Sequence, residues 1–343
     1  MKALVLEEYG KLVYRDVDDP EIGPDEVRIE VKACGICGSD VHGMDGSTGR
    51  RIPPIIMGHE ASGVIRERGK GVSDFASGER VTFDSTIYCG VCWHCRRGEI
   101  NLCDNRRVLG VSCPDYRRHG AFAQYVVVPK HILYKIPQEV DFIHAAMVEP
   151  LSIAMHAVGL ARPCIGETAA VIGVGTIGNL IIQALRTAGC KTVIAVDTDA
   201  EKFAGARRAG ADVALTPTAT EFAETIRSRT EGRGVDVALE AVGVTASVRT
   251  TVDVLRKGGR MVLVGNFTPD VTFPLLSVVT REIAVNGSCN SRGDYPTCLD
   301  LIARKRIDLD LVYSGHAPLA DGAKWFEKLR TPGSKLMKVV LEP

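Results

Sequence analysis

The sequence predicts an α/β protein of two domains, in which a β-rich first domain precedes a doubly wound parallel sheet. Three observations support this prediction. A chain of 343 residues is long for a single hydrophobic core. Short strands and glycine turns fill the chain up to about residue 128, whereas apolar strands alternate with helical segments from residue 168 to residue 287. The remaining helical segments and a last strand are expected to return to the first domain.

The composition is ordinary for a globular protein, with 45% hydrophobic residues, 24% charged residues and a formal net charge of zero. The sequence has no basic patch that would predict a nucleic-acid partner, and it has no apolar run of about 18 residues that would predict a membrane span. The apolar start of the chain is too short for a signal peptide. We therefore expect a cytoplasmic protein whose eleven cysteines are not a disulfide framework.

A half-buried strand is expected over residues 26–33, because apolar and charged residues alternate there (EVRIEVKA). It runs into CGICGSDVH at residues 34–42, whose glycines predict a turn entering a short helix, and MGHE follows at residues 57–60. This stretch gathers thiol, hydroxyl, imidazole and carboxylate groups, which bind zinc and relay protons. The rest of the chain then has to supply a substrate pocket and an electron acceptor.

A second metal motif lies in the loop at residues 89–103. Its cysteines follow a C-x2-C-x2-C-x7-C pattern and are Cys89, Cys92, Cys95 and Cys103. Four thiolates in a tight loop match a closed, tetrahedral structural zinc site. The spacing differs from that of a ferredoxin-like cluster, and His94 inside the loop is interpreted as a surface residue.

Apolar residues recur at helical spacing from Phe142 to Leu160, with Pro150 interrupting the pattern. Proline disfavours helical geometry in the preceding residue, so we expect Glu149 at a break between two helices, with its carboxylate near the start of the second. From these residues alone, Glu149 is interpreted as a first-turn acid that favours the helix dipole.

A dinucleotide motif begins at residue 168, where an apolar strand, a G-x-G-x-x-G turn and a helix follow one another. The glycines let the backbone approach a pyrophosphate at the helix N-terminus, and Asp197 at the end of the next strand would accept hydrogen bonds from a ribose. Because Asp197 would repel a 2′-phosphate and Asp199 adds a second acid, NAD is favoured over NADP. The residues of the turn are Gly173, Gly175, Thr176, Ile177 and Gly178.

These motifs together resemble the zinc-dependent medium-chain alcohol dehydrogenase family from end to end. The most similar branch is that of the polyol (sorbitol or L-iditol) dehydrogenases, which also have a glutamate at the position of Glu149, where simple alcohol dehydrogenases have a cysteine. The resemblance implies a Rossmann domain plus a β-rich GroES-like catalytic domain, with NAD and with one catalytic and one structural zinc per chain. The implied domains are 1–154 for catalysis, including the structural zinc loop, 155–291 for NAD, and 292–343 returning to the catalytic domain.

The resemblance also implies roles for single residues. Cys37 and His59 would bind the catalytic zinc, with Glu60 as the third ligand. Glu149 would either hold a water at the metal or exchange with Glu60. Asp40 would hydrogen-bond the free nitrogen of His59.

A proton path and a cofactor contact are implied in the same way. Ser39 would accept the proton of the substrate hydroxyl and pass it through the nicotinamide ribose toward His42. Lys202 would contact the adenosine ribose. Cys34 is left out, because the family's ligand is the cysteine just before G-S-D. A catalytic zinc held by carboxylates is expected to yield to a chelator more readily than the four-thiolate zinc.

The implied activity is oxidation of a secondary hydroxyl of a polyol or sugar alcohol to a ketone, with hydride transfer to NAD⁺. A threonine dehydrogenase is the closest rival, and the cations that could pair with an amino-acid carboxylate are Arg50, Arg51 and Arg292. A polar loop favours solvated surface positions for Arg50 and Arg51.

The sequence leaves the exact substrate and the assembly open. The segment SCNSRGDYP departs from the aromatic-rich form of the sorbitol enzymes, so a phosphorylated polyol or a cyclitol stays possible, with Arg292 as the residue of interest. A non-catalytic NAD-binding protein is a weaker hypothesis, because Cys37, His59 and Ser39 are all present. The strand EIAVNGS at residues 282–288 could pair edge to edge with a second copy, giving dimers or tetramers.

Overall fold

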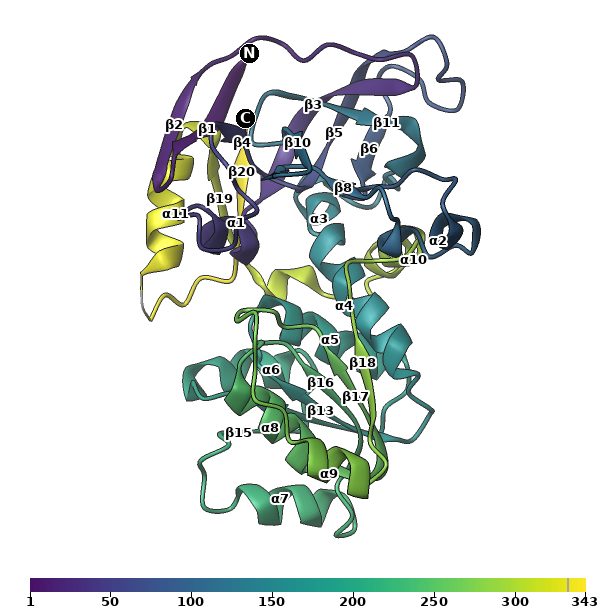
Figure 1. The fold of residues 1–343 in the computed structure, drawn as a ribbon, viewed down its shortest axis with the longest axis vertical. Helices are drawn as coiled ribbons and strands as arrows, with labels where there is room; N and C mark the ends of the chain where they lie inside the picture. The colour runs from purple at the N-terminus through teal and green to yellow at the C-terminus, as the bar shows by residue number, and fades with distance from the viewer. Residues whose placement is uncertain (332) are drawn as a thin grey trace. The chain divides into compact units, whose positions relative to one another are not determined.

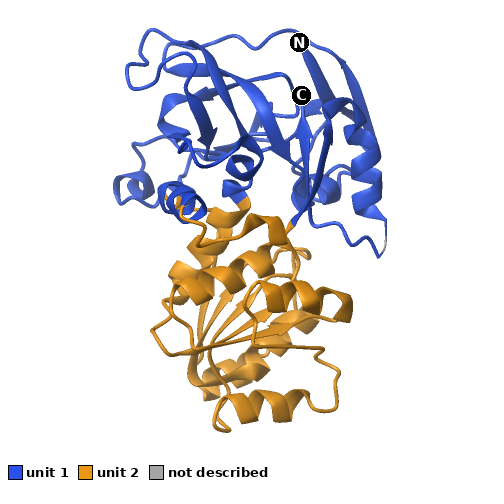
Figure 2. Cartoon of the chain, turned by 180° about the vertical axis from the view of Figure 1, so that it is seen from behind, with its two compact units in different colours: residues 1–149, 295–303, 313–343 blue, residues 150–294, 304–312 orange. Residues whose placement is uncertain are grey.

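The computed structural model describes residues 1–331 and 333–343 and divides the chain into two compact units (Figure 2). Unit 1 comprises Met1–Glu149, Tyr295–Ala303 and Tyr313–Pro343. Unit 2 comprises Pro150–Asp294 and Arg304–Val312. Within the described residues, none of the helices has the length and apolar character needed to cross a lipid bilayer.

Unit 1 is built on a seven-stranded sheet in the order β12-β6-β5-β3-β20-β19, with β11 also paired to β3 (Figure 1). Two two-stranded ladders, β10-β9 and β7-β8, and a three-stranded sheet, β2-β1-β4, lie in the same unit. The strands are β1 (Lys2–Glu8), β2 (Lys11–Asp16), β3 (Glu26–Gly35), β4 (Ile55–Ile56), β5 (Glu60–Arg68), β6 (Arg80–Phe83), β7 (Thr86–Ile87), β8 (Arg107–Val108), β9 (Val111–Cys113), β10 (Tyr116–Arg118), β11 (Tyr125–Pro129), β12 (Leu133–Lys135), β19 (Tyr313–Pro318) and β20 (Lys338–Glu342).

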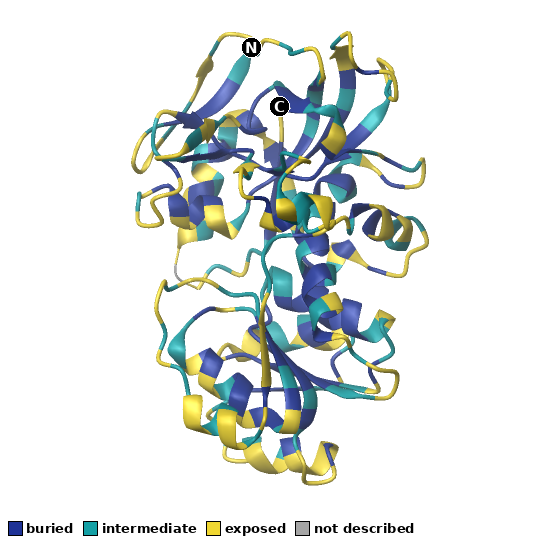
Figure 3. Cartoon of the chain, turned by 45° about the vertical axis from the view of Figure 1, so that its right-hand side comes forward, coloured by how far each residue is buried: buried dark blue, intermediate teal, exposed yellow. Residues whose placement is uncertain are grey.

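The helices of unit 1 are short and sit between these strands. They are α1 (Gly38–Gly43), α2 (Trp93–Arg96), α3 (Phe142–Ala146), α10 (Tyr295–Ala303) and α11 (Gly322–Arg330), with 3-10 turns at η1 (Ile100–Leu102), η2 (Lys130–Ile132) and η5 (Leu319–Asp321). The strand expected at residues 26–33 is confirmed as β3, whose side chains alternate between half-buried and buried positions. Because its inward side chains are apolar, β3 joins a core that includes Leu4, Ile65 and Phe122. Figure 3 colours the buried positions of the chain dark blue.

Strand β3 ends between two neighbours that carry functional residues. Gly35 pairs with Glu60 at the start of β5, and it also pairs with Val340 of β20. The first turn after β3 leads into α1. The expected short helix is therefore confirmed as α1, and β20, a strand from the end of the chain, lies beside β3.

Unit 2 contains a parallel six-stranded sheet in the order β15-β14-β13-β16-β17-β18, which confirms the expected doubly wound Rossmann arrangement (Figure 1). Its elements are β13 (Thr168–Ile172), α5 (Thr176–Thr187), β14 (Thr192–Val196), η3 (Ala200–Lys202), α6 (Phe203–Arg208), β15 (Val213–Leu215), α7 (Phe222–Arg229), β16 (Val235–Glu240), α8 (Thr245–Val254), β17 (Leu255–Leu263), α9 (Leu275–Thr280), β18 (Ala284–Gly287) and η4 (Leu309–Leu311). Strands β13 and β14 are buried over four successive residues, as continuous apolar strands of a covered parallel sheet are.

The structure refines the expected element boundaries. The chain breaks its helix at Met147, and α4 (Val148–Ala161) then begins, so Glu149 lies in the first turn of the second helix. Pro150 is tolerated there because the backbone N–H groups of a first helical turn have no partner inside the helix. Strand β19 was not expected, because its sequence YSGHAP has no alternation of apolar and polar residues.

The division of the chain also differs from the expected one. The units change at 149/150 and 294/295, against expected boundaries of 154/155 and 291/292, and Arg304–Val312 groups with unit 2. A side chain of α5 explains the last difference. Gln183 donates from Nε2 to the carbonyl of Asp308 at 2.9 Å and accepts from its backbone N–H at 2.7 Å. This amide satisfies both backbone groups of the segment, which ties it to the six-stranded sheet's layer of helices.

Candidate zinc and dinucleotide sites

The first candidate site lies in unit 1, where β3 and β5 meet. Cys37 directly precedes α1, His59 directly precedes β5 and Glu60 is the first residue of β5. One donor atom from each of these three residues lies within 4.8 Å of the other two. Thiolate, imidazole and carboxylate are the ligands that zinc takes in catalytic sites, so the donor set fits this metal. Cys34 is fully buried but stands outside the group.

A buried lysine faces Glu60, and sequence reasoning missed it. The Nζ of Lys338, the first residue of β20, lies 2.7 Å and 2.6 Å from the two carboxylate oxygens of Glu60 and donates to the carbonyl of Ile36 at 3.0 Å. A glycine makes room for the pair, because a Cβ at Gly35 would lie 2.3 Å from Glu60 Oε2. Burial lowers the pKa of Lys338, but the charge of Glu60 raises this pKa by a larger amount. The net shift is therefore upward. Lys338 is therefore an ammonium that pairs with both oxygens of the Glu60 carboxylate.

Asp40 and His59 lie within ion-pair distance, but the structure lacks the hydrogen bond between the described residues that the resemblance implies. Asp40 is fully buried in α1, and its Oδ1 is 3.5 Å from Nδ1 of His59, which makes no hydrogen bond to a described residue. Burial lowers the pKa of His59, but the charges of Asp40 and Cys37 outweigh it and hold that pKa well above its usual range. For Asp40, burial raises the pKa, yet His59 and Arg51 hold it well below its usual range. Asp40 is thus a buried carboxylate paired with cations.

The structure corrects the expectation for Arg51. We expected a solvated surface residue, but Arg51 is only 4% exposed, and its Nη2 lies 2.9 Å from Oδ1 of Asp40. The reason is that α1 presents a buried carboxylate to the loop, and a buried charge is stable only when paired. Arg50 and Arg292 are exposed.

The two residues of the implied proton path come from α1. The hydroxyl of Ser39, an exposed residue, donates to Sγ of Cys37 at 3.3 Å, so it adjoins a candidate zinc ligand. His42 is exposed in the last turn of the same helix, and its carbonyl accepts a hydrogen bond from the hydroxyl of Ser47 at 3.1 Å. The structure thus places Ser39 beside the ligand group and His42 three residues farther along the helix.

Glu149 keeps part of its side chain exposed and stands outside the three-residue ligand group. Burial is the largest influence on its pKa; His59 lowers and Glu60 raises the value, and the net result is about 8. The carboxyl therefore favours its neutral acid form at neutral pH, and a divalent cation nearby would favour the carboxylate. Between the two glutamates, the geometry favours Glu60 as the ligand.

Tyr295 is a second residue of this region that sequence reasoning missed. Its ring is fully buried and stacks on Tyr134 with 4.9 Å between ring centroids. Its hydroxyl makes no hydrogen bond to a described residue. Burial raises its pKa well above the usual range, and the charges of Asp84 and Glu149 add to the shift. No sequence pattern marks this tyrosine, because its neighbours come from distant segments.

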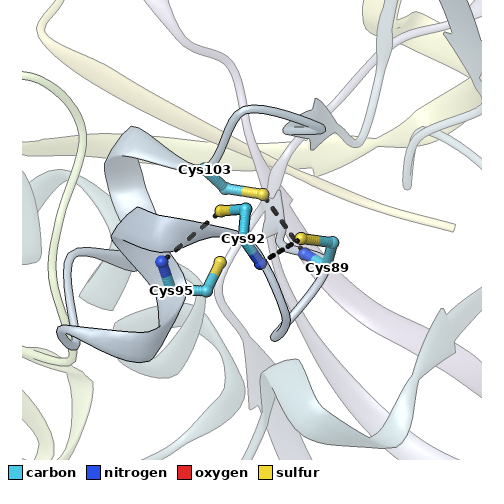
Figure 4. A group of neighbouring side chains, drawn as sticks. All are labelled: Cys89, Cys92, Cys95 and Cys103. Atoms are coloured by element: carbon cyan, nitrogen blue, oxygen red, sulfur yellow. Dashed lines mark hydrogen bonds between the residues drawn. The ribbon is translucent and has the colours of Figure 1, made fainter.

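The second candidate metal site is the four-cysteine loop of unit 1 (Figure 4). The sulfur atoms of its four cysteines all lie within 4.8 Å of one another. Figure 4 shows the side chains of Cys89, Cys92, Cys95 and Cys103 gathered together. Backbone N–H groups point at the sulfurs: Cys92 donates to Cys89 at 3.4 Å and Cys89 donates to Cys103 at 3.3 Å. The backbone N–H groups of Val91 and Cys92 lower the pKa of Cys89 to about 6. Four thiolates with no other ligand fit a structural zinc site.

His94 is partly exposed, with a side-chain exposure of 30%. Its Nδ1 lies 3.0 Å from Oε2 of Glu99, so its ring is held inside the loop by a carboxylate. It stays outside the ligand group, as expected. None of the eleven cysteines forms a disulfide.

The dinucleotide motif forms the turn between β13 and α5 in unit 2. Gly173 has a φ of +91°, and a Cβ on Gly178 would lie 1.9 Å from the carbonyl oxygen of Gly173. Gly175 precedes the first helical residue, Thr176, and has open space at its Cβ position. Gly178 is thus needed for the turn itself, whereas Gly175 leaves a free approach to the helix N-terminus, where Ile177 follows Thr176.

Asp197 lies directly after β14 and is held beside this turn. Its Oδ2 accepts from the backbone N–H of Val174 at 2.9 Å, and its Oδ1 accepts from that of Asp199 at 3.0 Å. Lys202 Nζ lies 3.2 Å and 3.3 Å from the two oxygens. The carboxylate of Asp199 caps η3 by accepting from the N–H of Glu201. The two expected cofactor residues, Asp197 and Lys202, therefore form one ion pair.

Glu240 at the end of β16 is a third carboxylate that sequence reasoning missed. It is fully buried, and its Oε1 accepts from the backbone N–H groups of Val242 and Gly243 at 2.9 Å and 2.8 Å. Its Oε2 makes no hydrogen bond to a described residue. Strands β14 and β16 flank β13. Asp197 accepts from Val174 in the glycine turn, whereas Glu240 holds the neighbouring loop that follows β16. The sequence feature that could have pointed to Glu240 is its place at the end of the predicted strand VDVALEA. Nothing in the neighbouring residues distinguishes this glutamate from an acid on the surface.

Comparison with known proteins agrees with this architecture. Residues 23–138 match the model of the alcohol dehydrogenase GroES-like domain, and residues 176–304 match that of the zinc-binding dehydrogenase family. The chain is 33% identical to D-xylulose reductase A of Aspergillus oryzae, with 96% of this chain and 93% of that protein covered. The chain belongs to the zinc-binding alcohol dehydrogenase family. This zinc-binding dehydrogenase is accordingly an oxidoreductase that acts on CH–OH groups.

Two further relatives cover nearly all of this zinc-binding dehydrogenase. Sorbitol dehydrogenase of Halalkalibacterium halodurans is 32% identical, with 100% of this chain and 99% of that protein covered. A solved structure from Sinorhizobium meliloti, described as a zinc-binding dehydrogenase bound to NADP, is 34% identical with a TM-score of 0.90 and covers 100% of this chain and 99% of that one. The family uses zinc and a nicotinamide cofactor, which agrees with the two cysteine-containing ligand groups and the glycine turn.

The glycine turn makes a testable prediction. Gly178→Ala places a methyl group against a backbone oxygen, so we expect it to lower the free energy of unfolding by about 1–3 kcal/mol or to prevent folding. Gly175→Ala meets no protein atom, and we expect a change in stability within about 0.5 kcal/mol. The same variant should weaken NADH binding about tenfold or more, because the methyl group stands where the pyrophosphate approaches. Thermal unfolding without cofactor and a fluorescence titration with NADH measure the two effects, and equal stability losses in both variants would contradict these roles of the two glycines.

Proposed function

We propose that this chain oxidises a secondary hydroxyl of a polyol or sugar alcohol to a ketone, with hydride transfer to NAD⁺. The observation that carries the proposal is the ligand group of Cys37, His59 and Glu60 with the hydroxyl of Ser39 next to it. The D-xylulose reductase and sorbitol dehydrogenase relatives bear names that fit a polyol substrate. Cys37, His59 and Glu60 would hold the catalytic zinc, and the four-cysteine loop would hold the structural one.

The chain's own residues then share the work of the reaction. The bound zinc supplies Lewis acidity, which favours loss of the substrate hydroxyl proton at neutral pH. Ser39 would take that proton and pass it toward His42 through the cofactor ribose. Glu149, whose pKa of about 8 makes it a neutral acid before a cation binds, would hold a water or replace Glu60 at the metal. The Lys338 ammonium pairs with both oxygens of Glu60 and would hold that carboxylate if Glu149 replaced it at the metal.

Three arginines help to choose between the candidate substrates, because an anionic substrate needs a cation to pair with. A threonine dehydrogenase needs a free cation for the substrate carboxylate, but Arg51 is already paired with Asp40. Arg50 and Arg292 are both exposed, and we retain Arg292 for a phosphorylated polyol because its segment, SCNSRGDYP, departs from the aromatic-rich form of the sorbitol enzymes. We place the polyol first and keep a sugar-alcohol phosphate or a cyclitol as the second candidate.

The activity is tested by following NADH formation with NAD⁺ and a panel of polyols, sugar-alcohol phosphates, cyclitols and L-threonine. We expect turnover with a polyol. Cys37→Ser should reduce kcat/KM at least about a hundredfold, because a serine hydroxyl is a weaker zinc ligand than the thiolate it replaces. NADH binding should stay unchanged. Cys164→Ser, at an exposed cysteine of unit 2, is the matched control and should behave as wild type. Full activity of Cys37→Ser would remove this residue from the zinc site, and turnover of L-threonine alone would overturn the polyol assignment.

Cofactor choice rests on Asp197. Its carboxylate repels a 2′-phosphate, and it also neutralises Lys202, which could otherwise attract that phosphate. Asp197→Ala should therefore weaken NAD⁺ and raise the ratio of kcat/KM for NADP⁺ to that for NAD⁺ by about tenfold or more. Asp270→Ala, at an exposed acid of the same unit, is the control. Steady-state kinetics with both cofactors measures the ratio, and an unchanged ratio in Asp197→Ala would show that another group selects the cofactor.

We also propose a homo-oligomer formed through β18. All four residues of this edge strand are exposed, and Val285 is 39% exposed although it is apolar. Leu275, Leu276 and Val279 of the neighbouring α9 are exposed as well. An unpaired edge beside apolar side chains fits pairing with a second copy of the chain.

The cytoplasm is the proposed compartment, since reducing conditions preserve the four thiols of the zinc loop.

Light scattering tests the assembly. A single chain has a mass of 37.0 kDa, and we expect a multiple of this value. Val285→Lys puts a charge on the edge and should shift the protein toward the single-chain mass. Ile165→Lys, at a residue 91% exposed elsewhere in unit 2, should leave the mass of the assembly unchanged. A wild-type protein with the mass of one chain at micromolar concentration would contradict the proposal.

A further inference from the structure

Arg51 is anchored by its backbone to a strand outside the ligand motifs. The N–H of Ile52 donates to the carbonyl of Ser112 at 3.2 Å, and the N–H of Ser112 donates to the carbonyl of Arg50 at 3.3 Å. Ser112 is the central residue of β9, and Arg51 forms an isolated bridge with it. The residue is therefore held at a fixed place, although it lies in a polar loop.

The side chain of Arg51 passes through a gap that a glycine leaves in α1. A Cβ on Gly43 would lie 2.7 Å from Cγ of Arg51, so any larger residue at position 43 would push the arginine stem aside. Asp40 stands three residues before Gly43, on the same face of the helix. Glycine and aspartate at this spacing form a slot that admits a long side chain and ends in a carboxylate.

The guanidinium group at the end of this slot contacts two polar groups. Nη2 lies 2.9 Å and Nε 3.3 Å from Oδ1 of Asp40, while Nη2 also lies 3.4 Å from Oγ of Ser39. Nη1 donates to the carbonyl of Arg50 at 3.0 Å, which fixes the plane of the group. Nη2 reaches both Asp40 and Ser39, and Nε adds a second hydrogen bond to Asp40, so the planar guanidinium holds this carboxylate through two nitrogens where a lysine has only one.

Each of these two groups touches a different candidate zinc ligand. Oδ1 of Asp40 is 3.5 Å from Nδ1 of His59, and the hydroxyl of Ser39 donates to Sγ of Cys37. The other oxygen of Asp40 makes no hydrogen bond to a described residue, so Arg51 supplies the direct hydrogen bonds that hold this carboxylate. Partners of metal ligands orient those ligands and raise metal affinity.

We propose that Arg51 is a positioning residue of the catalytic zinc site, which orders His59 through Asp40 and Cys37 through Ser39. The inference deepens the proposed function and rests on it, because it concerns the same metal site. It assigns a functional reason to a buried cation that forms no part of the ligand group. Loss of Arg51 leaves Asp40 without its hydrogen bonds, so His59 loses a fixed neighbour and Ser39 loses one of its two contacts.

The rate of zinc release tests this inference without measuring turnover. The zinc-loaded protein is mixed with a chelator and a colorimetric zinc indicator, and the release of the two zinc ions is followed over time. Arg51→Met keeps the stem of the side chain and removes its charge and donors. We expect it to release the catalytic zinc about 10–100-fold faster than wild type. The zinc of the four-cysteine loop is the internal control and should leave at the wild-type rate.

Three further measurements separate positioning from a general loss of stability. Arg50→Met, at the exposed neighbour, should release both ions as wild type does. Arg51→Lys keeps the charge but has one nitrogen donor in place of the guanidinium, so its catalytic zinc should leave at an intermediate rate. If Arg51→Met does not fold, the release rate of Arg51→Lys tests the inference. In both Arg51 variants kcat should fall more than the affinity for NADH, because the dinucleotide turn is untouched.

The outcomes are distinct. Release of the catalytic zinc at or below the wild-type rate in folded Arg51→Met, or in Arg51→Lys if Arg51→Met does not fold, would overturn the inference. Equal acceleration of both ions would also overturn it, since that pattern belongs to a loosened fold. If wild type bound zinc at Cys37 but oxidised no alcohol, the proposed function would fail while the release rates would still decide the role of Arg51.

Discussion

The candidate zinc site of unit 1 depends on the pairing of its buried acidic groups with cations. Three acidic groups, Cys37, Asp40 and Glu60, surround one imidazole, and isolated charges of this kind are too costly to bury. Two cations answer them: Lys338 takes both oxygens of Glu60, and Arg51 takes Oδ1 of Asp40. With Glu60 and Asp40 each paired to a cation, a divalent cation held by Cys37 and His59 would meet no large excess of negative charge. The pairs also hold the ligands in place before any metal arrives.

The sheet makes this compensation possible, because it brings together segments that are far apart along the chain. Gly35 pairs with Glu60 on one side and with Val340 on the other, so the end of β3 sits between Glu60, the candidate ligand of β5, and β20, the strand that begins with Lys338. Small residues open the space that the cations need: Gly35 for the Glu60–Lys338 pair and Gly43 for the stem of Arg51. In unit 2, carboxylates at the ends of β14 and β16 fix the glycine turn and the loop that follows β16 in a comparable way.

Local sequence was sufficient for the parts whose chemistry is written in short motifs. The spacing of the four cysteines, the Cys37 and His59-Glu60 motifs, and the glycine turn with Asp197 all predicted groups that the structure brings together. Lys338 and Arg51 could not be found in this way. Lys338 is 278 residues from its partner, and Arg51 lies in a loop whose polar composition indicates solvent exposure. Strand β19 and the buried hydroxyl of Tyr295 escaped for the same reason, because each depends on neighbours that only the fold supplies.

We infer above all that one chain builds two zinc sites of different chemistry, one for catalysis and one for structure. Diffraction at the zinc absorption edge, from crystals of the zinc-loaded protein, tests this most directly. We predict two anomalous peaks per chain, one among Cys89, Cys92, Cys95 and Cys103, and one in contact with Cys37 and His59. A single peak in the four-cysteine loop, or a second peak away from Cys37 and His59, would contradict the catalytic assignment.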